Sequence, residues 1–556
     1  MSVDSRPNGL VDAPAPKRAP RVSLDLVAYA LLLAVSVFIF DGWMGLSALH
    51  PSHLEWLYLG DYRRNLAALN LFRSSSWQFP LGHIETSDFP VGANIVFMDG
   101  NLLLAIVTKL LAPFLGPAAQ TYGAWVYLCA LLQFWSIYWA LRQLAVSSVC
   151  AFLGALLIGL LPTFYYRVGH LNLLPHFLII IGWGTLLSAS MTSSDRFRVF
   201  LALIVFSVFT HFYFTPPLVL MAVLTQWRAC SYRADTATLR FVARQACIIL
   251  ALMLSAMFAA GYFQHFRDDS SGFGFYSMNL NAFINPLGAD AEDTSRYVST
   301  LPIGTAGQYE GYQYLGLGLL LFVLMAGFML GRRIVAGVDA PVWSLWLALT
   351  ILSLSNQVYL GSSLVFGIEL PRALMGLVSP FRASGRYGWF VVYPVLLVVF
   401  SNLYRHVRAR SSGSWRSGIT VFALVVALLT VVQFEDIRSV LVLRRGAPPP
   451  TLPAGVAVAR TVAAYVLASG FRGPIFIDVP DIETNKDVFA PLTAELAGRR
   501  VSISPAPNVR ENLRYSGRDH IQDTLDAHGL VITQSCERAL TARKIELLPA
   551  WCAFAG

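Results

Sequence analysis

Charged residues are scarce in this 556-residue chain: Asp, Glu, Lys and Arg make up 13% of it, against 56% for hydrophobic residues. In soluble domains about a quarter of the residues are charged, so the chain is not a set of ordinary soluble domains. The mean hydropathy of +0.57 indicates a membrane protein with many spans. Its net charge is +9, but Lys and Arg gather in short loops between apolar runs, as the positive-inside bias requires. Nucleic acid is therefore not an expected partner.

The sequence also lacks the short motifs of several enzyme classes. It contains no GxxxxGK[ST] loop and no Rossmann fingerprint after a strand, which argues against a nucleotide-dependent enzyme. No HExxH or CxxC partner stands near His170, so we expect no metal ligation there. No cofactor is assigned, and a divalent cation stays open. There is no tandem repeat at solenoid periods.

Eleven apolar runs can cross a bilayer as helices, for which about 20 residues are needed. They are centred on Leu24–Met44, Tyr122–Leu141, Val149–Phe164, Leu171–Met191, Val199–Thr210, Phe214–Gln226, Phe241–Tyr262, Leu315–Leu330, Val342–Tyr359, Gly388–Tyr404 and Gly418–Phe434. The run Leu102–Leu115 is short, carries Lys109 and is closed by Pro113 and Gly116, so we expect an interfacial or re-entrant helix. With that choice, the arginine-rich loops all fall on the cytoplasmic side.

This topology divides the chain into parts. They are a disordered cytoplasmic tail (1–22), a transmembrane domain (23–435) with large outer loops at 46–101 and 264–314, a linker (436–455) and an extracytoplasmic domain (456–556). The last part alternates short β-rich runs with helix-like stretches, which indicates an α/β domain. The expected fold class is thus an α-helical polytopic membrane protein, with about 11 transmembrane helices and a small C-terminal extracytoplasmic α/β domain.

Cysteine is rare as well, with six residues in the chain. Four lie in or beside expected spans, where Cys acts as a small hydrophobe: Cys129, Cys150, Cys230 and Cys247. Cys536 and Cys552 are the two in the C-terminal domain. An oxidising compartment favours a disulfide between them, with two unrelated buried thiols as the alternative. We expect the disulfide.

Polar residues gather in four clusters on the expected outer face. The clusters are Asp61 with Arg63 and Arg64, followed by Glu85, Asp88 and Asp99; YYRVGHLN (Tyr165–Asn172); GFGFYSMNLNAFINPLG (Gly272–Gly288) with GQYEGYQYLG (Gly307–Gly316); and SPFRASGRYGW (Ser379–Trp389). All four face one compartment in this topology, so we expect the chemistry on that side.

Each cluster also has a purely structural interpretation. Asp61 could cap the helix expected from Tyr62 to about Phe72, a role that does not exclude catalysis. Arg167 could extend to the lipid–water interface, and His170 could be a hydrogen-bonded interfacial histidine. The aromatic residues of GQYEGYQYLG could form an interfacial belt.

Two arginine arrangements favour chemistry. Arg382 and Arg386, spaced i, i+4, can form a fork for phosphate, which arginine binds bidentately. On a helix starting near Tyr62, Arg64 projects about 300° from Asp61 and Arg63 about 200°, so Arg64 is the expected ionic neighbour. A carboxylate that takes a proton from a hydroxyl, beside cations that stabilise a departing phosphate, predicts glycosyl transfer from a lipid-linked sugar phosphate by one in-line displacement.

These features resemble the GT-C superfamily of polyprenyl-phosphate-sugar-dependent glycosyltransferases. The shared layout is one span, a long outer loop with an early acidic residue, an interfacial apolar helix and a P-x3-YR turn. GDYRRNLAALNLFRSSSWQFPLG, PTFYYRVGHLNLLPHFLI, YSMNLNAFINPLG, GQYEGYQYLGLG and FRASGRYGW look like uncharacterised bacterial members, over roughly Leu24 to Tyr404. The resemblance implies that Asp61 is the catalytic base. In place of the superfamily's second-loop acidic motif, this chain has Arg167, His170 and Asn172.

We therefore expect an inverting glycosyltransferase of the bacterial inner membrane, with its active site and C-terminal domain facing the periplasm. It would move a sugar from a polyprenyl-phosphate donor to a cell-surface glycan or lipid acceptor. The expected site residues are Asp61 as base; Arg386, Arg382, Arg167 and His170 on the donor phosphate; and Arg64, Asp99, Asn172, Tyr309, Glu310 and Tyr312 on the substrates. A flippase or transporter of lipid-linked glycans and an inactive assembly protein are the alternatives. Transporters usually carry ionisable residues at mid-membrane, and the near absence of such charges favours the enzyme.

Overall fold

The computed structural model describes residues 23–555, apart from a set of short segments. These are 88–91, 99, 231–232, 234, 265–271, 289–292, 411–414, 479–481, 500, 505–520, 522–523, 527–528, 535, 538–541 and 549–550. The expected tail 1–22, Asp88 and the expected substrate residue Asp99 lie outside the described residues.

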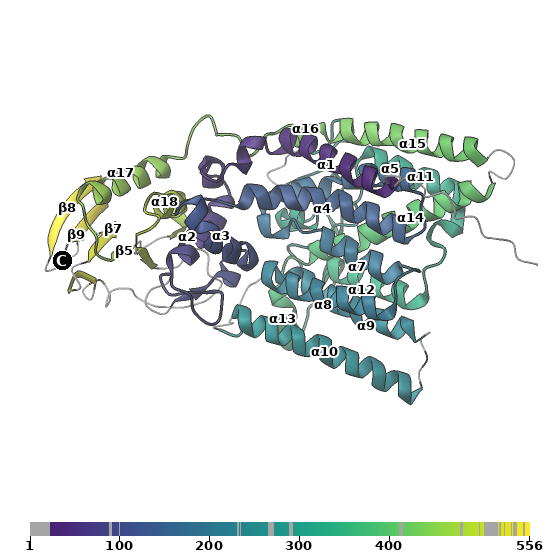
Figure 1. Cartoon of the computed structure of the whole chain (residues 1–556), viewed down its shortest axis with the longest axis horizontal. Helices are drawn as coiled ribbons and strands as arrows, with labels where there is room; N and C mark the ends of the chain where they lie inside the picture. Colours follow the sequence, from purple (N-terminus) through teal and green to yellow (C-terminus); the bar gives the residue numbers. More distant parts are fainter. Residues whose placement is uncertain are drawn as a thin grey trace, which may run out of the picture.

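A bundle of apolar helices forms the larger part of the molecule (Figure 1). Its helices are α1 (Leu24–Trp43), α4 (Tyr122–Gln143), α5 (Ser148–Gly159), α6 (Pro162–Tyr166), α7 (Phe177–Leu187), α8 (Ser193–Thr210), α9 (Thr215–Ala229), α10 (Thr236–Ala260), α11 (Leu317–Leu330), α12 (Ala340–Leu354), α14 (Trp389–Arg410) and α15 (Trp415–Asp436). In α1 the buried residues recur at about every fourth position, as in Ala28, Leu32, Ser36 and Phe40. They form one helix face, which packs on α4 and α5.

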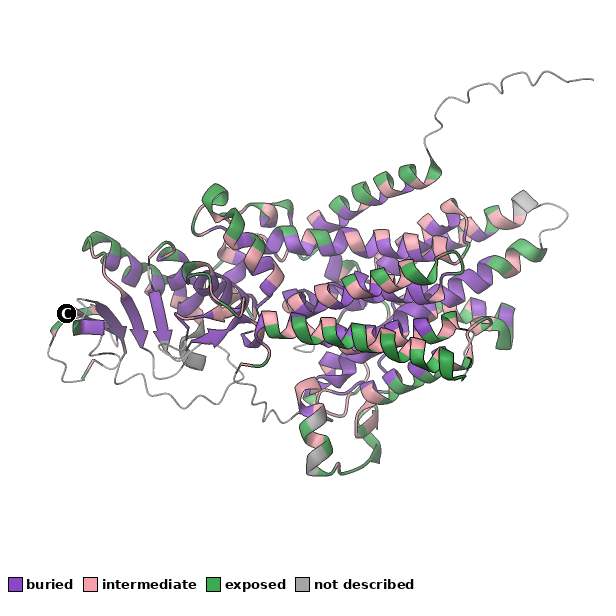
Figure 2. Ribbon diagram, turned by 60° about the horizontal axis from the view of Figure 1, so that its bottom comes forward, coloured by how far each residue is buried: buried purple, intermediate pink, exposed green. Residues whose placement is uncertain are grey.

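The outer helices of the bundle are exposed along much of their length (Figure 2), and many of their exposed side chains are large and apolar. Phe258 on α10, Phe328 on α11 and Leu428 on α15 are all more than half exposed. Exposed large apolar side chains on this scale are costly in water, so these faces contact lipid.

Within the described residues, six helices are long and apolar enough to cross a membrane. The number is seven if α5 and Pro162–Gly169, which meet at a bend of 44°, form one broken span. The other expected spans correspond to the shorter or less apolar helices α7, α8, α9 and α12. The polytopic helical fold is confirmed, whereas the number of eleven spans stays a prediction.

The expected span Val342–Tyr359 is wrong beyond Leu354. Helix α12 ends at Leu354, and β3 (Gln357–Leu360) pairs antiparallel with β4 (Ser363–Gly367). Ser355 and Gly361 have φ of +68° and +60°, a conformation that a helix cannot contain. The apolar residues beyond Leu354 therefore form a hairpin.

The first outer loop contains two helices, α2 (Tyr62–Ser74) and α3 (Leu102–Leu115), and a short antiparallel pair of β1 (His83–Ile84) with β2 (Ala93–Asn94). The expected interfacial run Leu102–Leu115 is thus helical over the same residues. The Asn101 side chain accepts a hydrogen bond from the Leu104 N–H and starts α3, and Gly116 at φ +95° ends it.

Short helices complete the outer face and the connections. The 3₁₀ segments are η1 (Leu46–Leu49), η2 (Glu55–Tyr58), η3 (Ile95–Phe97), η4 (Arg167–Gly169), η5 (Leu171–Leu173), η6 (Phe212–Phe214), η8 (Ala306–Gly311), η9 (Gly331–Val335), η10 (Ser379–Phe381) and η11 (Ser384–Gly388); the short α-helices are α13 (Arg372–Val378) and α16 (Arg438–Leu441).

The C-terminal region forms an α/β unit. It contains α17 (Ala454–Ala468), β5 (Ile475–Asp478), α18 (Ile482–Glu495), β6 (Val501–Ser504), β7 (Leu530–Thr533), β8 (Arg543–Leu548) and β9 (Trp551–Ala555). The sheet order is β6-β5-β7-β9-β8, in which β6, β5 and β7 are parallel and the last two strands antiparallel. All residues of β5 and β7 are buried, as is typical of parallel strands covered on both faces.

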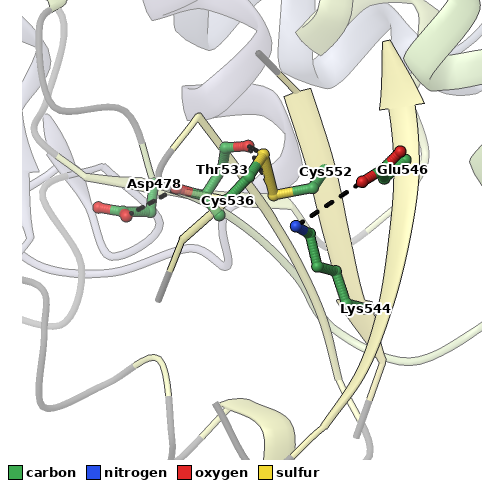
Figure 3. The surroundings of a disulfide bond; sticks show 6 residues. All are labelled: Asp478, Thr533, Cys536, Lys544, Glu546 and Cys552. Carbon is green, nitrogen blue, oxygen red and sulfur yellow. Dashed lines mark hydrogen bonds and ion pairs between the residues drawn. A yellow bond between two sulfur atoms is a disulfide. The ribbon is translucent and has the colours of Figure 1, made fainter. Parts of the chain in front are cut away.

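A disulfide joins Cys536, just after β7, to Cys552 on β9, with the two Cα atoms 5.7 Å apart. Figure 3 shows this bond beside Thr533, whose carbonyl lies 3.5 Å from the Cys552 sulfur. The other described cysteines are free. The disulfide therefore links the end of β7 to β9, the two neighbouring strands at which the antiparallel part of the sheet begins.

The C-terminal unit packs directly on the first outer loop, because α18 lies against α2 (Figure 1). Arg63 on α2 forms an ion pair with Asp487 on α18, and Asn70 donates a hydrogen bond to Thr493. The Ile503 N–H of β6 also donates to the Thr86 carbonyl at 2.8 Å. The C-terminal unit and the Asp61 loop thus lie at the same end of the bundle.

Candidate active site

A cavity of about 200 Å³ lies at this end of the bundle. Its lining residues come from all four polar clusters and from the turn between α8 and α9. They are Asp61, Arg64, Asn65, His170, Asn172, Leu173, His211, Tyr213, Tyr276, Tyr309, Glu310, Arg382, Ala383 and Arg386. Segments that are more than 300 residues apart in sequence, at Asp61 and Arg386, therefore meet around one space.

Asp61 occupies the position before the first turn of α2, but its side chain makes no capping hydrogen bond. Its carboxylate instead lies 3.5 Å from Arg64 Nη1 and 3.7 Å from His170 Nδ1. The capping interpretation is therefore wrong, and the expected Asp61–Arg64 pair is confirmed. Arg63 points away, because it binds Asp487 of the C-terminal unit.

Glu310 is the centre of a buried ionic cluster beside Asp61. Only 4% of Glu310, 2% of Arg167 and 8% of Arg386 is exposed. Arg386 donates from Nε and Nη2 to the Glu310 carboxylate at 3.1 and 2.7 Å, and Arg167 Nη1 donates to it at 2.5 Å. His170 Nε2 lies 3.3 Å from Glu310 Oε1, so this imidazole bridges Glu310 and Asp61.

The charges in this cluster determine the protonation of Glu310. Burial alone would raise the pKa of its carboxyl. The charges of Arg386 and Arg167, together with the hydrogen bond from His170, outweigh burial and hold this pKa well below 4.5. Glu310 is therefore ionised at neutral pH and acts as a counter-charge. Next to it, burial and the charge of Glu310 raise the pKa of Tyr309 to about 12, so Tyr309 keeps its hydroxyl proton.

Two glycines bring the loops of this cluster together. A Cβ atom at Gly385 would lie 2.5 Å from the Cα of Gly311, closer than real Cβ contacts come. These glycines directly follow Glu310 and precede Arg386, so the close backbone approach brings the two charged side chains within reach of each other.

A break between helices positions His170. Helix α5 ends at Gly159, and Pro162 starts α6 at its first position, where the missing N–H of proline carries no penalty. The bend of 44° turns the chain toward the outer face. The following 3₁₀ segments then place His170 and Asn172 on the cavity wall.

The arginines that the sequence assigns to a donor phosphate occupy different positions. The fork of Arg386 is bound to Glu310, and Arg167 is paired with Glu310 and does not line the cavity. Arg382 does line the cavity, with its guanidinium 5.6 Å from the centre of the Tyr276 ring. Among the described residues no carboxylate lies within ion-pair distance of Arg382. Of the two arginines, Arg382 is thus the one that lines the cavity with no carboxylate partner among the described residues.

The remaining expected substrate residues separate into two groups. Arg64, Asn172, Tyr309 and Glu310 line the cavity, whereas Tyr312 is buried beside it. The Tyr312 hydroxyl is hydrogen-bonded to that of Thr294 at 2.6 Å. Tyr312 therefore supports the loop and does not form part of the wall.

The structure adds residues that sequence reasoning missed, above all His211 and Tyr213 in the turn between α8 and α9. The Tyr213 hydroxyl accepts a hydrogen bond from the Ala383 N–H at 3.1 Å, and the Arg386 guanidinium lies 4.8 Å from its ring centre. A histidine that interrupts two apolar runs was the signal in the sequence.

Within the described part of the chain, no group of three or more His, Cys, Asp or Glu side chains could hold a metal ion.

Eight chains among solved structures match this fold. ArnT from Cupriavidus metallidurans in the apo state has a TM-score of 0.51 at 12% identity, covering 96% of this chain and 98% of that chain. ArnT bound to undecaprenyl phosphate has a TM-score of 0.46 at 11% identity, over 95% and 97% of the chains. Arabinofuranosyltransferase AftD from Mycobacteria has a TM-score of 0.40 at 16% identity, over 91% of this chain and 36% of that one.

The likeness to apo ArnT confirms the expected GT-C-like fold. No curated protein matches the chain. Residues 31–438, nearly the whole helical bundle with its outer loops, match the family model described as Domain of unknown function (DUF6311), and the chain belongs to this family.

Proposed function

We propose that the protein is an inverting glycosyltransferase that uses a polyprenyl-phosphate sugar as donor and a cell-surface glycan or lipid as acceptor. The observation that carries this proposal is the single cavity in which Asp61 lies beside the cations of its wall. The cavity lies at one end of a lipid-facing bundle, where a lipid-borne phosphate presents its head group. ArnT, whose fold the chain shares, binds such a lipid, undecaprenyl phosphate.

In the proposed reaction, the Asp61 carboxylate accepts the proton of an acceptor hydroxyl. The acceptor oxygen then bonds to the anomeric carbon of the sugar as the bond from that carbon to the phosphate oxygen breaks. Attack opposite the leaving group inverts the configuration at this carbon. The products are the glycosylated acceptor and the polyprenyl phosphate, and the proton is left on Asp61.

We assign the departing phosphate chiefly to Arg382. The charge that grows on the phosphate oxygens needs a fixed cation, and the cavity wall offers Arg382, which pairs with no carboxylate of the described residues. For Arg386 the same role would require displacement of Glu310 from two hydrogen bonds. Arg386 therefore acts as a positioning residue that holds Glu310 and, through His170, the surroundings of Asp61.

The location of the buried charges supports an enzyme over a flippase. Glu310, Arg167 and Arg386 lie on η8, η4 and η11, at the helix ends that surround the cavity, whereas transporters usually place such groups at mid-membrane. Arg142 and Arg228, for example, lie in the last turns of α4 and α9. By the positive-inside bias, we assign the cavity to the periplasmic side of a bacterial inner membrane.

The test is transfer by the purified protein with a polyprenyl-phosphate sugar, measured as release of polyprenyl phosphate. Asp61→Asn keeps the shape of the side chain and removes the base, so turnover should fall by about 10² to 10⁴-fold. Glu85→Gln is the matched control, because Glu85 lies in the same loop and binds Ser76 and Gln78 outside the cavity. Near-normal turnover by Asp61→Asn would remove Asp61 from the mechanism. Transport of a lipid-linked glycan without any transfer would favour the flippase.

A further inference from the structure

A second cavity, of about 220 Å³, lies where the C-terminal unit meets the first outer loop. Asn70, Arg73 and Ser74 of α2 form one wall, and Thr493 and Arg499 at the end of α18 form another. Ala112 near the end of α3 closes the third side. The cavity shares no lining residue with the candidate active site.

Among the described residues that line this second cavity, two are positively charged, Arg73 and Arg499, and none is negatively charged. Arg73 donates to the Ala119 carbonyl at 2.5 Å and to the Asn70 side-chain oxygen at 2.8 Å, and both acceptors are neutral. Arg499 makes no side-chain hydrogen bond or ion pair to another described residue. The nearby carboxylates of α18 are engaged elsewhere, because Asp487 binds Arg63 and Glu495 binds Arg460.

A charge without a counter-ion is unfavourable in a half-buried position. Burial lowers the pKa of Arg73 to about 10, so this side chain is still charged at neutral pH. An anion placed between the two guanidiniums would supply the counter-charge and accept charge-assisted hydrogen bonds.

The third wall, formed by α3, indicates which kind of molecule would carry the anion. Helix α3 exposes large apolar side chains next to Ala112, among them Leu111 at 40% and Leu115 at 38%. Leu115 lies three residues after Ala112, which places it on the cavity side of α3. Apolar surface beside a cationic pocket suits an amphiphile whose acyl chains cover α3 while its head group enters the cavity.

We propose that this cavity binds the phosphate head group of an anionic membrane phospholipid, held between Arg73 and Arg499 with its acyl chains along α3. The lipid would join three elements, α2, α3 and α18, and so fasten the C-terminal unit to the membrane surface. This proposal is independent of the reaction at the first cavity.

The experiment is lipid binding to the full-length protein in detergent, followed by native mass spectrometry, with phosphatidylglycerol, phosphatidylcholine and inorganic phosphate as probes. We expect saturable binding of phosphatidylglycerol that Arg499→Gln weakens by about tenfold, the worth of one charge-assisted hydrogen bond. Arg198→Gln is the control, because Arg198 is an exposed arginine on α8 that pairs with Asp195, and it should bind as the wild type does.

A second variant and the two comparison ligands distinguish the possible outcomes. Ala497→Phe fills the cavity without changing its charge, and it should weaken phosphatidylglycerol binding as well. Unchanged binding in both Arg499→Gln and Ala497→Phe would overturn the proposal. Phosphatidylcholine that binds as tightly as phosphatidylglycerol would show that the net negative charge of the lipid is not recognised. Inorganic phosphate that competes as strongly as the lipid itself would show a site for free phosphate and overturn the lipid assignment.

Discussion

Arg386 binds Glu310 through both of its fork nitrogens, Nε and Nη2, and each carboxylate oxygen accepts one of these hydrogen bonds. The two residues are 76 positions apart in the chain and both are buried. Because the planar guanidinium matches the planar carboxylate, this pair fixes the relative orientation of the two loops. The ion pair therefore builds the wall against which Asp61 and His170 are placed.

The first prediction concerns the counter-charge. Glu310→Gln leaves Arg167 and Arg386 buried without a carboxylate, so the protein should lose about 3 to 5 kcal/mol of stability. The measurement is the apparent melting temperature of the purified protein in detergent, with Glu85→Gln as the control at a half-buried carboxylate outside the cluster. A melting temperature equal to that of the wild type would mean that the cluster does not stabilise the outer loops.

The second prediction is the pH dependence of this effect. The pKa of Glu310 is lower in the folded protein than its ordinary value of 4.5, so its contribution to stability is complete above about pH 4.5 and is lost as the pH falls through the folded pKa. The difference in melting temperature between wild type and Glu310→Gln should be constant from about pH 8 to about pH 5 and narrow below about pH 4.5. A difference that already narrows between neutral pH and about pH 5 would contradict the lowered pKa.

The third prediction separates the two arginines of SPFRASGRYGW. Arg382→Gln should reduce donor-dependent turnover by about 10² to 10³-fold with little change in melting temperature, because Arg382 has no carboxylate partner to lose among the described residues. Arg386→Lys keeps the positive charge but loses the bidentate pairing with Glu310. Its main effect should therefore be a lower melting temperature. If Arg386→Lys stays stable and inactive while Arg382→Gln turns over normally, the phosphate belongs to Arg386.

The fourth prediction tests the approach of the two glycines. Gly385→Ala places a methyl group 2.5 Å from the Cα of Gly311, so the two loops must separate. The free energy of unfolding should fall by about 1 to 3 kcal/mol, and turnover should fall as well. Gly376→Ala on α13 is the control, since nothing lies within 4 Å of its added Cβ. Equal stability and equal turnover of the two variants would show that the loops can move apart without a loss of free energy.

The fifth prediction concerns the C-terminal sheet. The Cys536–Cys552 disulfide closes a loop with a sequence separation of 16, for which loop entropy gives about 3 kcal/mol of stabilisation. Protein purified without reductant should resist alkylation at both positions, and Cys552→Ser should make the C-terminal unit more sensitive to protease. Free alkylation of both thiols in the native protein would rule the disulfide out.

The sequence predicts those parts of the fold that depend on local pattern. The bounds of α3 follow from Asn101, the apolar run and Gly116, and the four polar clusters are visible because charge is so rare around them. The Glu310–Arg386 pair is not predictable in this way, because no local signal connects residues 76 positions apart. From sequence, Arg386 is expected to bind phosphate, because a sequence does not show which anion lies nearest to its guanidinium. His211 and Tyr213 were missed because their 3₁₀ turn lies between two apolar runs and is itself aromatic.

The hydrogen bond from the Ile503 N–H to the Thr86 carbonyl has a consequence for how the protein is made. A ribosome completes residue 86 more than 400 residues before residue 503, so the first outer loop is synthesised long before the sheet that it joins exists. Contacts of such high sequence separation form late, after the loop-closure entropy has been overcome. The loop that carries Asp61 should therefore reach its final order only after the last strands of the chain arrive, and a nascent or truncated chain would hold an assembled bundle with an incomplete outer face.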